Sequence, residues 1–317
     1  MYHIGIDLGG TNIAVGVTDD DFNIIGRGRK RTPVGAESDE IISEMAAAAK
    51  MAVENAGLQM SDIADVGIAA PGTINSETGY IEYSNNIKFK NYPAVQKLKE
   101  LLGADKCYIA NDANAAAYGE LLAGAGKGCK DFVAVTLGTG VGSGIILDGK
   151  ILTGSNFAGG EIGHSYIIAG GEKCSCGNCG CWEAYASASA LKRQTAEAMK
   201  AHPESVMWKI AGSLEGVDGR TAFDAMRKND EAGKEVVENY IRYVSIGIVN
   251  VINIFQPEFV CIGGGICNEK ETLLAPIREF VDAHDYNRNP KVRTKICTAI
   301  LGNDAGIIGA AGLFKLA

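Results

Sequence analysis

The sequence predicts an α/β protein made of two similar halves that face each other across a central cleft. Short segments of the first half are echoed in the second: residues 7–12 (DLGGTN) resemble residues 136–141 (TLGTGV). Each half also carries Asn-Asp-Ala, at 111–113 and at 303–305, which opens a helix of small residues after an apolar strand. The two Asn-Asp-Ala segments are separated by more residues than the two glycine segments are. We therefore expect an insertion in the second half.

The first half reads as three hairpin-linked strands followed by alternating helices and strands. The first predicted helix, residues 38–56, has Ser38 at its N-cap, acidic residues in its first turn and an apolar stripe at helical spacing. The predicted strands are residues 2–8, 12–18, 22–31, 64–69 and 106–110. The other predicted helices are residues 93–102 and 112–123.

The second half repeats this order around its insertion. Its predicted strands are residues 131–136, 141–147, 149–152, 258–262 and 292–297. Its predicted helices are residues 232–255, 269–284 and 304–315, with Asp304 as the N-cap of the last. We expect an N-terminal domain of residues 1–111 and a C-terminal domain of residues 112–303. The terminal segment 304–317 is expected to pack back on the first domain.

Composition excludes several function classes. The net charge of −8 leaves no basic surface for nucleic acid, although backbone N–H groups and Mg²⁺ can still hold a phosphate. The longest apolar stretch, residues 244–255, is too short to span a bilayer, and no signal-peptide pattern is visible at the N-terminus. We therefore expect a cytoplasmic protein without a nucleic-acid or membrane partner.

One loop carries most of the reactive side chains. Four of the nine cysteines lie within eight residues, at positions 174, 176, 179 and 181, and His164 lies ten positions upstream. Thiolates with an imidazole are the ligand set that tetrahedral zinc prefers, and four protein ligands would make the site structural. The alternative is a group of buried or redox-active thiols. Glu161 and Glu183 flank the set, where a metal-stiffened loop could present them to a ligand.

Two glycine-rich turns occupy corresponding places in the two halves: Gly9, Gly10, Thr11 and Asn12, and then Gly138, Thr139 and Gly140. Each lies between two strands, whereas the glycines of a P-loop or dinucleotide fingerprint lead from a strand into a helix. A glycine turn lets N–H groups and a hydroxyl approach phosphate oxygens. Most single turns of this kind are only hairpins, but two matching turns favour a phosphate site. The glycines at 263–265 follow an apolar strand and are expected to accept an adenosine.

These motifs together resemble the ROK (repressor, open reading frame, kinase) family of sugar kinases. The resemblance rests on DLGGT at 7–11, LGTG at 137–140, GEIGH at 160–164 and CSCGNCGCWE at 174–183, and it covers essentially the whole chain. It implies two ribonuclease H-like domains of the kind found in actin and hexokinase. It also implies transfer of phosphate from ATP to a hexose with Mg²⁺. Within the family the chain looks most like bacterial ATP-dependent glucokinases, and family members are commonly homodimers or homotetramers.

The resemblance implies a role for each matching residue. Asp112 would be the catalytic base, although an Asp before a helix can also be simply its N-cap. Asp7, which could instead be a strand-end carboxylate, would hold Mg²⁺ through water. The sugar would contact Gly72, Asn85, Asn111, Asp112, Glu161, His164 and Glu183. The nucleotide would contact Gly9, Gly10, Thr11, Asn12, Gly138, Thr139, Gly140, Gly264 and Gly265. Zinc would bind His164, Cys174, Cys176 and Cys181, with Cys179 as a spare thiol.

Two other functions stay open at this point. One is a kinase of the same family that acts on N-acetylmannosamine, N-acetylglucosamine or fructose. The other is a sugar-sensing regulator that binds hexose without turning it over. Asp112, the two glycine turns and the absence of a DNA-binding extension before the first strand favour the enzyme.

Overall fold

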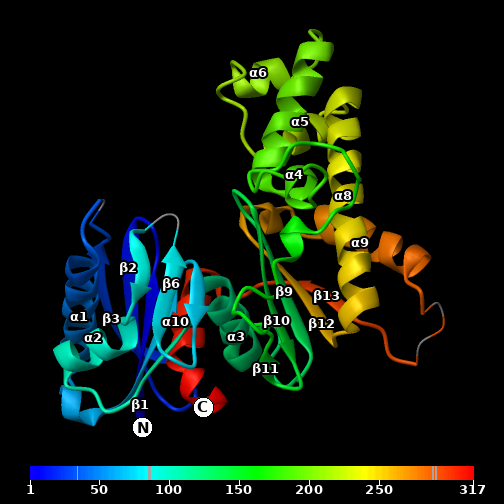
Figure 1. The fold of residues 1–317 in the computed structure, drawn as a ribbon. Coiled ribbons are helices and arrows are strands. Elements are labelled where there is room, and N and C mark those ends of the chain that lie inside the picture. The colour runs from blue at the N-terminus through cyan, green and yellow to red at the C-terminus, as the bar shows by residue number, and fades with distance from the viewer. Residues whose placement is uncertain (34, 85–86, 288, 290) are drawn as a thin grey trace. The chain divides into compact units, whose positions relative to one another are not determined.

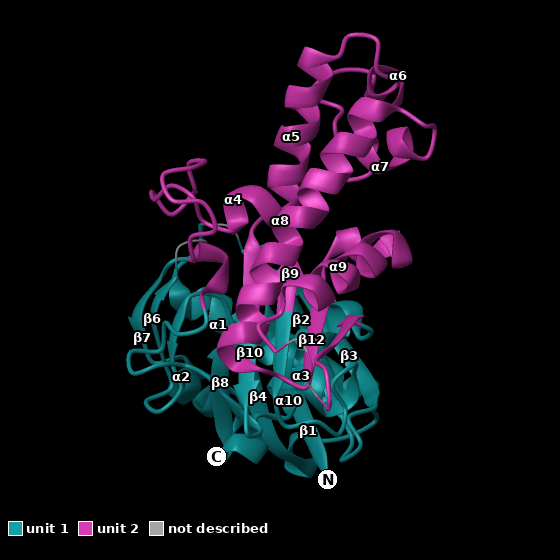
Figure 2. Cartoon of the chain, turned by 90° about the vertical axis from the view of Figure 1, so that its right-hand side faces the viewer, with its two compact units in different colours: residues 1–134, 144–160, 300–317 teal, residues 135–143, 161–299 magenta. Residues whose placement is uncertain are grey.

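The computed structural model describes residues 1–33, 35–84, 87–287, 289 and 291–317. The chain divides into two compact units, coloured separately in Figure 2. Unit 1 comprises residues 1–134, 144–160 and 300–317, and unit 2 comprises residues 135–143 and 161–299. The domains expected from the sequence, residues 1–111 and 112–303, do not correspond to these two units, so the boundary near Asn111 stays a prediction.

Unit 1 is built on a five-stranded sheet with the order β3-β2-β1-β4-β8. Its strands are β1 (Tyr2–Leu8), β2 (Asn12–Thr18), β3 (Ile24–Arg31), β4 (Ile63–Ala70) and β8 (Cys107–Asn111). β2 pairs antiparallel with β1 and β3, whereas β4 runs parallel to β1 and β8. The central strand β1 buries Ile4, Ile6 and Leu8 on one face and His3 and Gly5 on the other, as expected for a strand covered on both faces. The predicted strands of this sheet are therefore confirmed.

Helices cover both faces of this sheet (Figure 1). α1 (Ser38–Asn55) packs on β2 and β3 and is joined by α2 (Ala94–Leu102), while α10 (Ala305–Ala311) packs on β1 and β4 and against α3 (Asp112–Ala123). The N-cap prediction for Ser38 is wrong, because Glu37 holds the cap position. The Ser38 hydroxyl donates instead to the Lys88 carbonyl at 2.8 Å, which ties the helix start to a loop.

Small residues let α3, α10 and the sheet approach closely. A Cβ added at Gly309 of α10 would lie 1.7 Å from the Ala115 carbonyl oxygen of α3. A Cβ at Gly67 of β4 would lie 1.8 Å from the Ala310 carbonyl oxygen. Contacts this short are impossible for any side chain, so the small-residue pattern after each Asn-Asp-Ala is a packing requirement.

The C-terminal segment corrects a second capping prediction. A single helix over residues 304–315 was expected, but the chain forms η4 (Gly302–Asp304), α10 and η5 (Leu313–Leu316). Asp304 occupies the N-cap position of α10, yet its side chain makes no capping hydrogen bond. Its two carboxylate oxygens accept from the Arg27 guanidinium at 2.7 and 2.8 Å. A bidentate ion pair has replaced the cap.

A second five-stranded sheet repeats the order of the first. Its order is β11-β10-β9-β12-β13. In both sheets the strand that comes first in the sequence is central, with the second and third strands on one side of it and the fourth and fifth on the other. The strands are β9 (Phe132–Leu137), β10 (Val141–Leu147), β11 (Lys150–Ile151), β12 (Phe259–Gly263) and β13 (Lys295–Thr298). This repeated order confirms the predicted duplicated α/β fold. A small third sheet, β5 (Thr73–Asn75), β6 (Tyr80–Ser84) and β7 (Phe89–Tyr92), was not predicted.

The helices of unit 2 gather around α8 (Glu231–Phe255), which contacts α4, α5, α7 and α9. The other helices are α4 (Glu183–Ala186), α5 (Ala188–Ala201), α6 (Met207–Ala211), α7 (Thr221–Met226) and α9 (Glu271–His284). α8 buries Val236, Tyr240 and Val244, as its predicted core stripe requires. Within the described residues, no helix combines the length and apolar character needed to cross a membrane.

Candidate functional site

Asp112 lies at the junction of β8 and α3 in unit 1. The N-cap of α3 is Asn111, whose Oδ1 accepts from the N–H groups of Ala113 at 2.9 Å and Asn114 at 3.3 Å. The reading of Asp112 as the cap is therefore wrong. Asp112 Oδ1 accepts from the Ala113 N–H at 2.9 Å, and the carboxylate also interacts with the backbone N–H of Asp112 itself. The carboxylate therefore lies at the positive end of α3.

Asp7 and Asp112 influence each other electrostatically. Burial, together with a smaller effect of the negative charge of Asp112, raises the pKa of Asp7 to about 6. Burial also raises the pKa of Asp112, against the lowering effect of the Ala113 N–H. Two neighbouring carboxylates in a poorly solvated place favour a shared proton or a cation. The arrangement fits a hard divalent ion held near Asp7.

The glycine turn at residues 9–12 is a closed hairpin next to Asp7. The Gly9 N–H donates to the Asn12 carbonyl at 2.9 Å. Thr32, directly after β3, stabilises the turn with two hydrogen bonds. Its hydroxyl donates to the Gly9 carbonyl at 2.6 Å and its N–H donates to the Thr11 carbonyl at 3.0 Å. Gly10 and Thr11 remain exposed at the tip. Space beside Gly10 is open, because a Cβ there would meet nothing within 4 Å.

The structure also brings together two of the predicted sugar contacts in unit 1. The Asn111 Nδ2 donates to the Gly72 carbonyl at 3.1 Å. Gly72 has a φ of +109°, and a Cβ there would lie 2.1 Å from the Tyr83 carbonyl oxygen, so only glycine fits. Asn85, the third predicted contact from this part of the chain, lies outside the described residues.

The corresponding turn in unit 2, residues 138–140, is fastened from two sides. The Gly138 N–H donates to the Gly140 carbonyl at 3.0 Å, and the Ala188 N–H at the start of α5 donates to the Gly138 carbonyl at 2.8 Å. Thr139 is exposed at the tip. The turn thus offers a hydroxyl and a rigid backbone, as phosphate binding requires.

A cavity of about 300 Å³ lies beside this turn. It includes the predicted residues Gly138, Thr139 and Gly265. Gly264 supports the wall from behind: its φ is +101°, and a Cβ there would lie 2.3 Å from the Leu137 carbonyl oxygen. The full lining is Leu137, Gly138, Thr139, Ala188, Asp218, Gly219, Arg220, Gly265, Ile266, Asn268 and Glu269.

Several lining residues of this cavity were missed by the sequence analysis. Asp218 holds the loop before α7 in shape, since its Oδ1 accepts from the Arg220 and Thr221 N–H groups at 2.9 and 3.0 Å. Glu269 is paired with Arg227. The Arg220 side chain is exposed, and its charge interacts with the carboxylate of the nearby Asp218. These residues come from the insertion and a distant loop, and no motif marks them.

The predicted metal ligands converge. One ligand atom each from His164, Cys174, Cys176 and Cys181 lies within 4.8 Å of the others. The Cys176 and Cys181 sulfurs are 3.7 Å apart, and Cys174 Sγ is 3.6 Å from His164 Nδ1. Tetrahedral zinc with bonds of about 2.3 Å to sulfur and 2.0–2.1 Å to nitrogen requires separations of about 3.8 and 3.6 Å. The residues therefore fit zinc, and the sulfur separation is far beyond the roughly 2.05 Å of a disulfide.

The metal loop is anchored at its C-terminal end. Trp182 is 1% exposed, and its indole N–H donates to the Tyr243 carbonyl of α8 at 2.9 Å. A Cβ at Gly247 of α8 would lie 1.9 Å from the Trp182 ring, so this glycine makes room for the indole. Within the loop, isolated β-bridges join Tyr166 to Cys181 and Lys173 to Cys179. Cys179 is exposed and lies outside the group of four ligand atoms.

The three remaining predicted sugar contacts have different surroundings. Glu161 is exposed and precedes η2 (Ile162–His164), whose His164 N–H donates to the Glu161 carbonyl at 3.1 Å. His164 turns Nδ1 toward Cys174, which leaves Nε2 on the other side of the ring. The Glu183 carboxylate is occupied by the protein: Oε2 accepts from the Val141 N–H at 3.0 Å, and Oε1 from the Ser175 hydroxyl at 2.7 Å.

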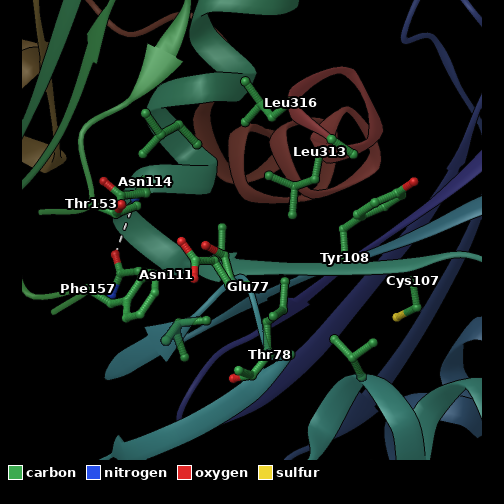
Figure 3. Close-up of a pocket in the computed structure, with 18 of the residues that line it drawn as sticks. Glu77, Thr78, Cys107, Tyr108, Asn111, Asn114, Thr153, Phe157, Leu313 and Leu316 are labelled. Carbon is green, nitrogen blue, oxygen red and sulfur yellow. Dashed lines mark hydrogen bonds between the residues drawn. The ribbon is translucent and has the colours of Figure 1, made fainter. Parts of the chain in front are cut away.

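A larger cavity of about 710 Å³ lies within unit 1. Figure 3 shows Asn111, Asn114 and Phe157 at one end of it, and Tyr108 and Cys107 at the other. Asp112 is not among its lining residues. We therefore do not assign the reacting groups to this cavity.

Comparison with known proteins decides the family. The model of the ROK family matches residues 3–317. The chain belongs to the ROK family. Among ROK relatives, the glucokinase of Thermotoga maritima is 37% identical, across 98% of this chain and 96% of that protein. The glucokinase of Halalkalibacterium halodurans is 35% identical, across 99% and 95%. The crystal structure of a ROK family glucokinase from Streptomyces griseus in complex with glucose and AMPPNP is 33% identical, covers 99% of both chains and has a TM-score of 0.78.

Proposed function

We propose that this ROK-family chain is an ATP-dependent hexokinase that converts glucose to glucose 6-phosphate. The observation that carries the proposal is the full-length similarity to glucokinases, one of them solved with glucose and an ATP analogue. The side chains that such a reaction needs are present in both units: two glycine turns, a carboxylate base and a set of polar groups for sugar hydroxyls.

Asp112 is the proposed general base. Its carboxylate accepts the proton of the glucose 6-hydroxyl as that oxygen attacks the γ-phosphorus of ATP. The bond between the γ-phosphorus and the oxygen that bridges to the β-phosphate breaks, and ADP leaves. Burial raises the pKa of Asp112, and a raised pKa makes its carboxylate a better proton acceptor. Phosphoryl transfer otherwise depends mostly on positioning, which the glycine turns provide, and on charge neutralisation, which Mg²⁺ would supply.

The donor is held mainly by backbone groups in this proposal. The turns at 9–12 and 138–140 contact phosphate oxygens, and the cavity beside Gly265 receives the adenosine. Arg220 supplies a cation at the same cavity. Mg²⁺, when bound, neutralises phosphate charge, and Asp7 is the carboxylate that would hold it through water.

The sugar is held by the polar groups of Asn111, Glu161 and His164. Asn111 is already locked by its cap bonds and by its bond to Gly72, so little entropy is lost when a hydroxyl binds. The metal loop carries His164 and so sets its position. Zinc, when bound, would supply rigidity rather than chemistry, because its four protein ligands leave no open position.

The acid limb of kcat/KM is expected near pH 6. Both Asp7 and Asp112 must be ionised in the free enzyme, the first to attract Mg²⁺ and the second to accept a proton. Burial raises both pKa values, that of Asp7 to about 6, so ionised Asp7 is lost as pH falls through this value. Ionised Asp112 is likewise lost at a higher pH than for an exposed carboxylate. The measurement is a pH profile of kcat/KM with glucose. A flat profile down to about pH 5 would contradict the assignment of these carboxylates.

Gly264→Ala is expected to raise the KM for ATP by about tenfold or more, since a methyl group forced against the Leu137 carbonyl must displace the cavity wall. Glucose affinity should stay within about twofold. Gly212→Ala is the matched control, because Gly212 also has a positive φ, of +74°, but has open space for a Cβ. ATP titrations of both folded variants make the comparison. An unchanged KM in Gly264→Ala argues against the adenosine cavity.

A panel of sugars tests the substrate. ADP release measured with glucose, N-acetylmannosamine, N-acetylglucosamine and fructose should give the highest kcat/KM with glucose. A higher kcat/KM for an N-acetylhexosamine or fructose would show that this sugar, and not glucose, is the substrate, and the protein would still be a sugar kinase. Sugar binding without ADP release from any member of the panel would indicate a regulator.

A further inference from the structure

Glu183 joins two parts of unit 2 that have separate proposed roles. Its Oε2 accepts from the N–H of Val141, the residue that follows the glycine turn 138–140, at 3.0 Å. The fit is tight, since a Cβ at Gly140 would lie 2.3 Å from the same oxygen. The turn therefore takes its position directly against the Glu183 carboxylate.

The other carboxylate oxygen reaches the metal loop. Glu183 Oε1 accepts from the hydroxyl of Ser175 at 2.7 Å and lies 3.6 Å from Cys174 Sγ. Ser175 stands between Cys174 and Cys176, two of the four grouped ligands, so its backbone is fixed wherever those thiols are fixed. The two oxygens of one side chain thus contact the metal loop and the glycine turn.

We propose that Ser175 and Glu183 form a link through which the metal loop positions the glycine turn 138–140, and that ATP affinity therefore depends on this link. The inference rests on the proposed function of that turn as a donor phosphate site. Ser175 is a positioning residue: its hydroxyl fixes the rotamer of Glu183, and Glu183 Oε2 then holds the Val141 N–H. A carboxylate released from Ser175 is free to rotate, and the turn loses one of its supports.

The decisive variant is Ser175→Ala, with binding of MgATP measured by calorimetry. We expect the dissociation constant to rise by about threefold to tenfold, as for loss of one exposed hydrogen bond to a charged group. Zinc content per chain should not change. Ser175→Thr retains the hydroxyl and should bind MgATP like the wild type. Cys179→Ala, a change at an exposed thiol of the same loop outside the ligand group, is the matched control.

Removal of zinc tests whether the metal loop acts on the glycine turn through Ser175 and Glu183. Chelation should weaken MgATP binding in the wild type, and it should weaken it less in Ser175→Ala, because two changes on one route are not additive. Additive effects would overturn the link, as would wild-type MgATP affinity in Ser175→Ala. Zinc loss in Ser175→Ala would also overturn it, since Ser175 would then act by retaining metal. A wild-type protein that binds no MgATP would instead reject the proposed function.

Discussion

Asp112→Asn is expected to lower kcat for glucose phosphorylation by about 10²- to 10⁴-fold, the usual contribution of a general base. Asparagine has the same shape and keeps an oxygen that can accept from the Ala113 N–H, but it cannot take up a proton. The cap of α3 is Asn111, so the substitution leaves the start of the helix intact. Dissociation constants for glucose and MgATP should therefore change little. Steady-state kinetics and calorimetry on the same preparation separate the two effects.

Asp304→Asn is the matched control for this variant. Asp304 occupies the corresponding Asn-Asp-Ala of the second half, but its carboxylate pairs with Arg27 and is placed in no proposed site. It should retain wild-type kcat with a small loss of stability, as for a partly exposed ion pair. Near-normal turnover in Asp112→Asn would show that the base lies elsewhere.

Cys181→Ser is expected to have the second large effect, because Cys181 is fully buried and belongs to the converging ligand group. Loss of one thiolate weakens zinc binding, and the binding energy of a structural zinc is largely folding energy. We expect zinc content well below one per chain and an unfolding temperature lower by about 5–15 °C, at about 2–4 °C per kcal/mol for domains of this size. Glucose affinity should fall at least tenfold because His164 loses its anchor.

Cys179→Ser separates this effect from the general removal of a thiol. Cys179 lies in the same loop, is exposed and stands outside the ligand group, so its zinc content, unfolding temperature and glucose affinity should match the wild type. Unchanged glucose affinity in Cys181→Ser protein verified to be metal-free would refute the coupling between metal and sugar.

The parts of the structure governed by local pattern could be predicted from the sequence. Alternation of β-branched residues located β1 and β2 to the residue, and the apolar stripe located α1 and α8 within one residue. A metal site was also predictable, because His164 and the four clustered cysteines come from one loop. The exclusion of Cys179 from the ligands came from the resemblance to the family. The echo between the halves gave the fold class, since a repeated sequence order implies a repeated strand order.

The parts decided by tertiary contacts could not be predicted. Asp304 has the sequence context of a cap, but Arg27, far away in the chain, provides a charged partner that a cap cannot match. Asn111 rather than Asp112 caps α3, because two adjacent residues are both good caps and only the geometry of the turn distinguishes them. Glu183 stays a predicted sugar contact, but its hydrogen bonds with the Val141 N–H and the Ser175 hydroxyl depend on how the loop folds and could not be predicted.

The central claim is that this chain transfers the γ-phosphate of ATP to the 6-oxygen of glucose. The most direct measurement supplies ATP, Mg²⁺ and either glucose or 6-deoxyglucose, and follows ADP together with glucose 6-phosphate through a dehydrogenase coupled to that product. Our account predicts equal amounts of ADP and glucose 6-phosphate from glucose, and no sugar-dependent ADP from 6-deoxyglucose although it binds. Glucose binding without glucose 6-phosphate, or ADP release that is the same with both sugars, would contradict it.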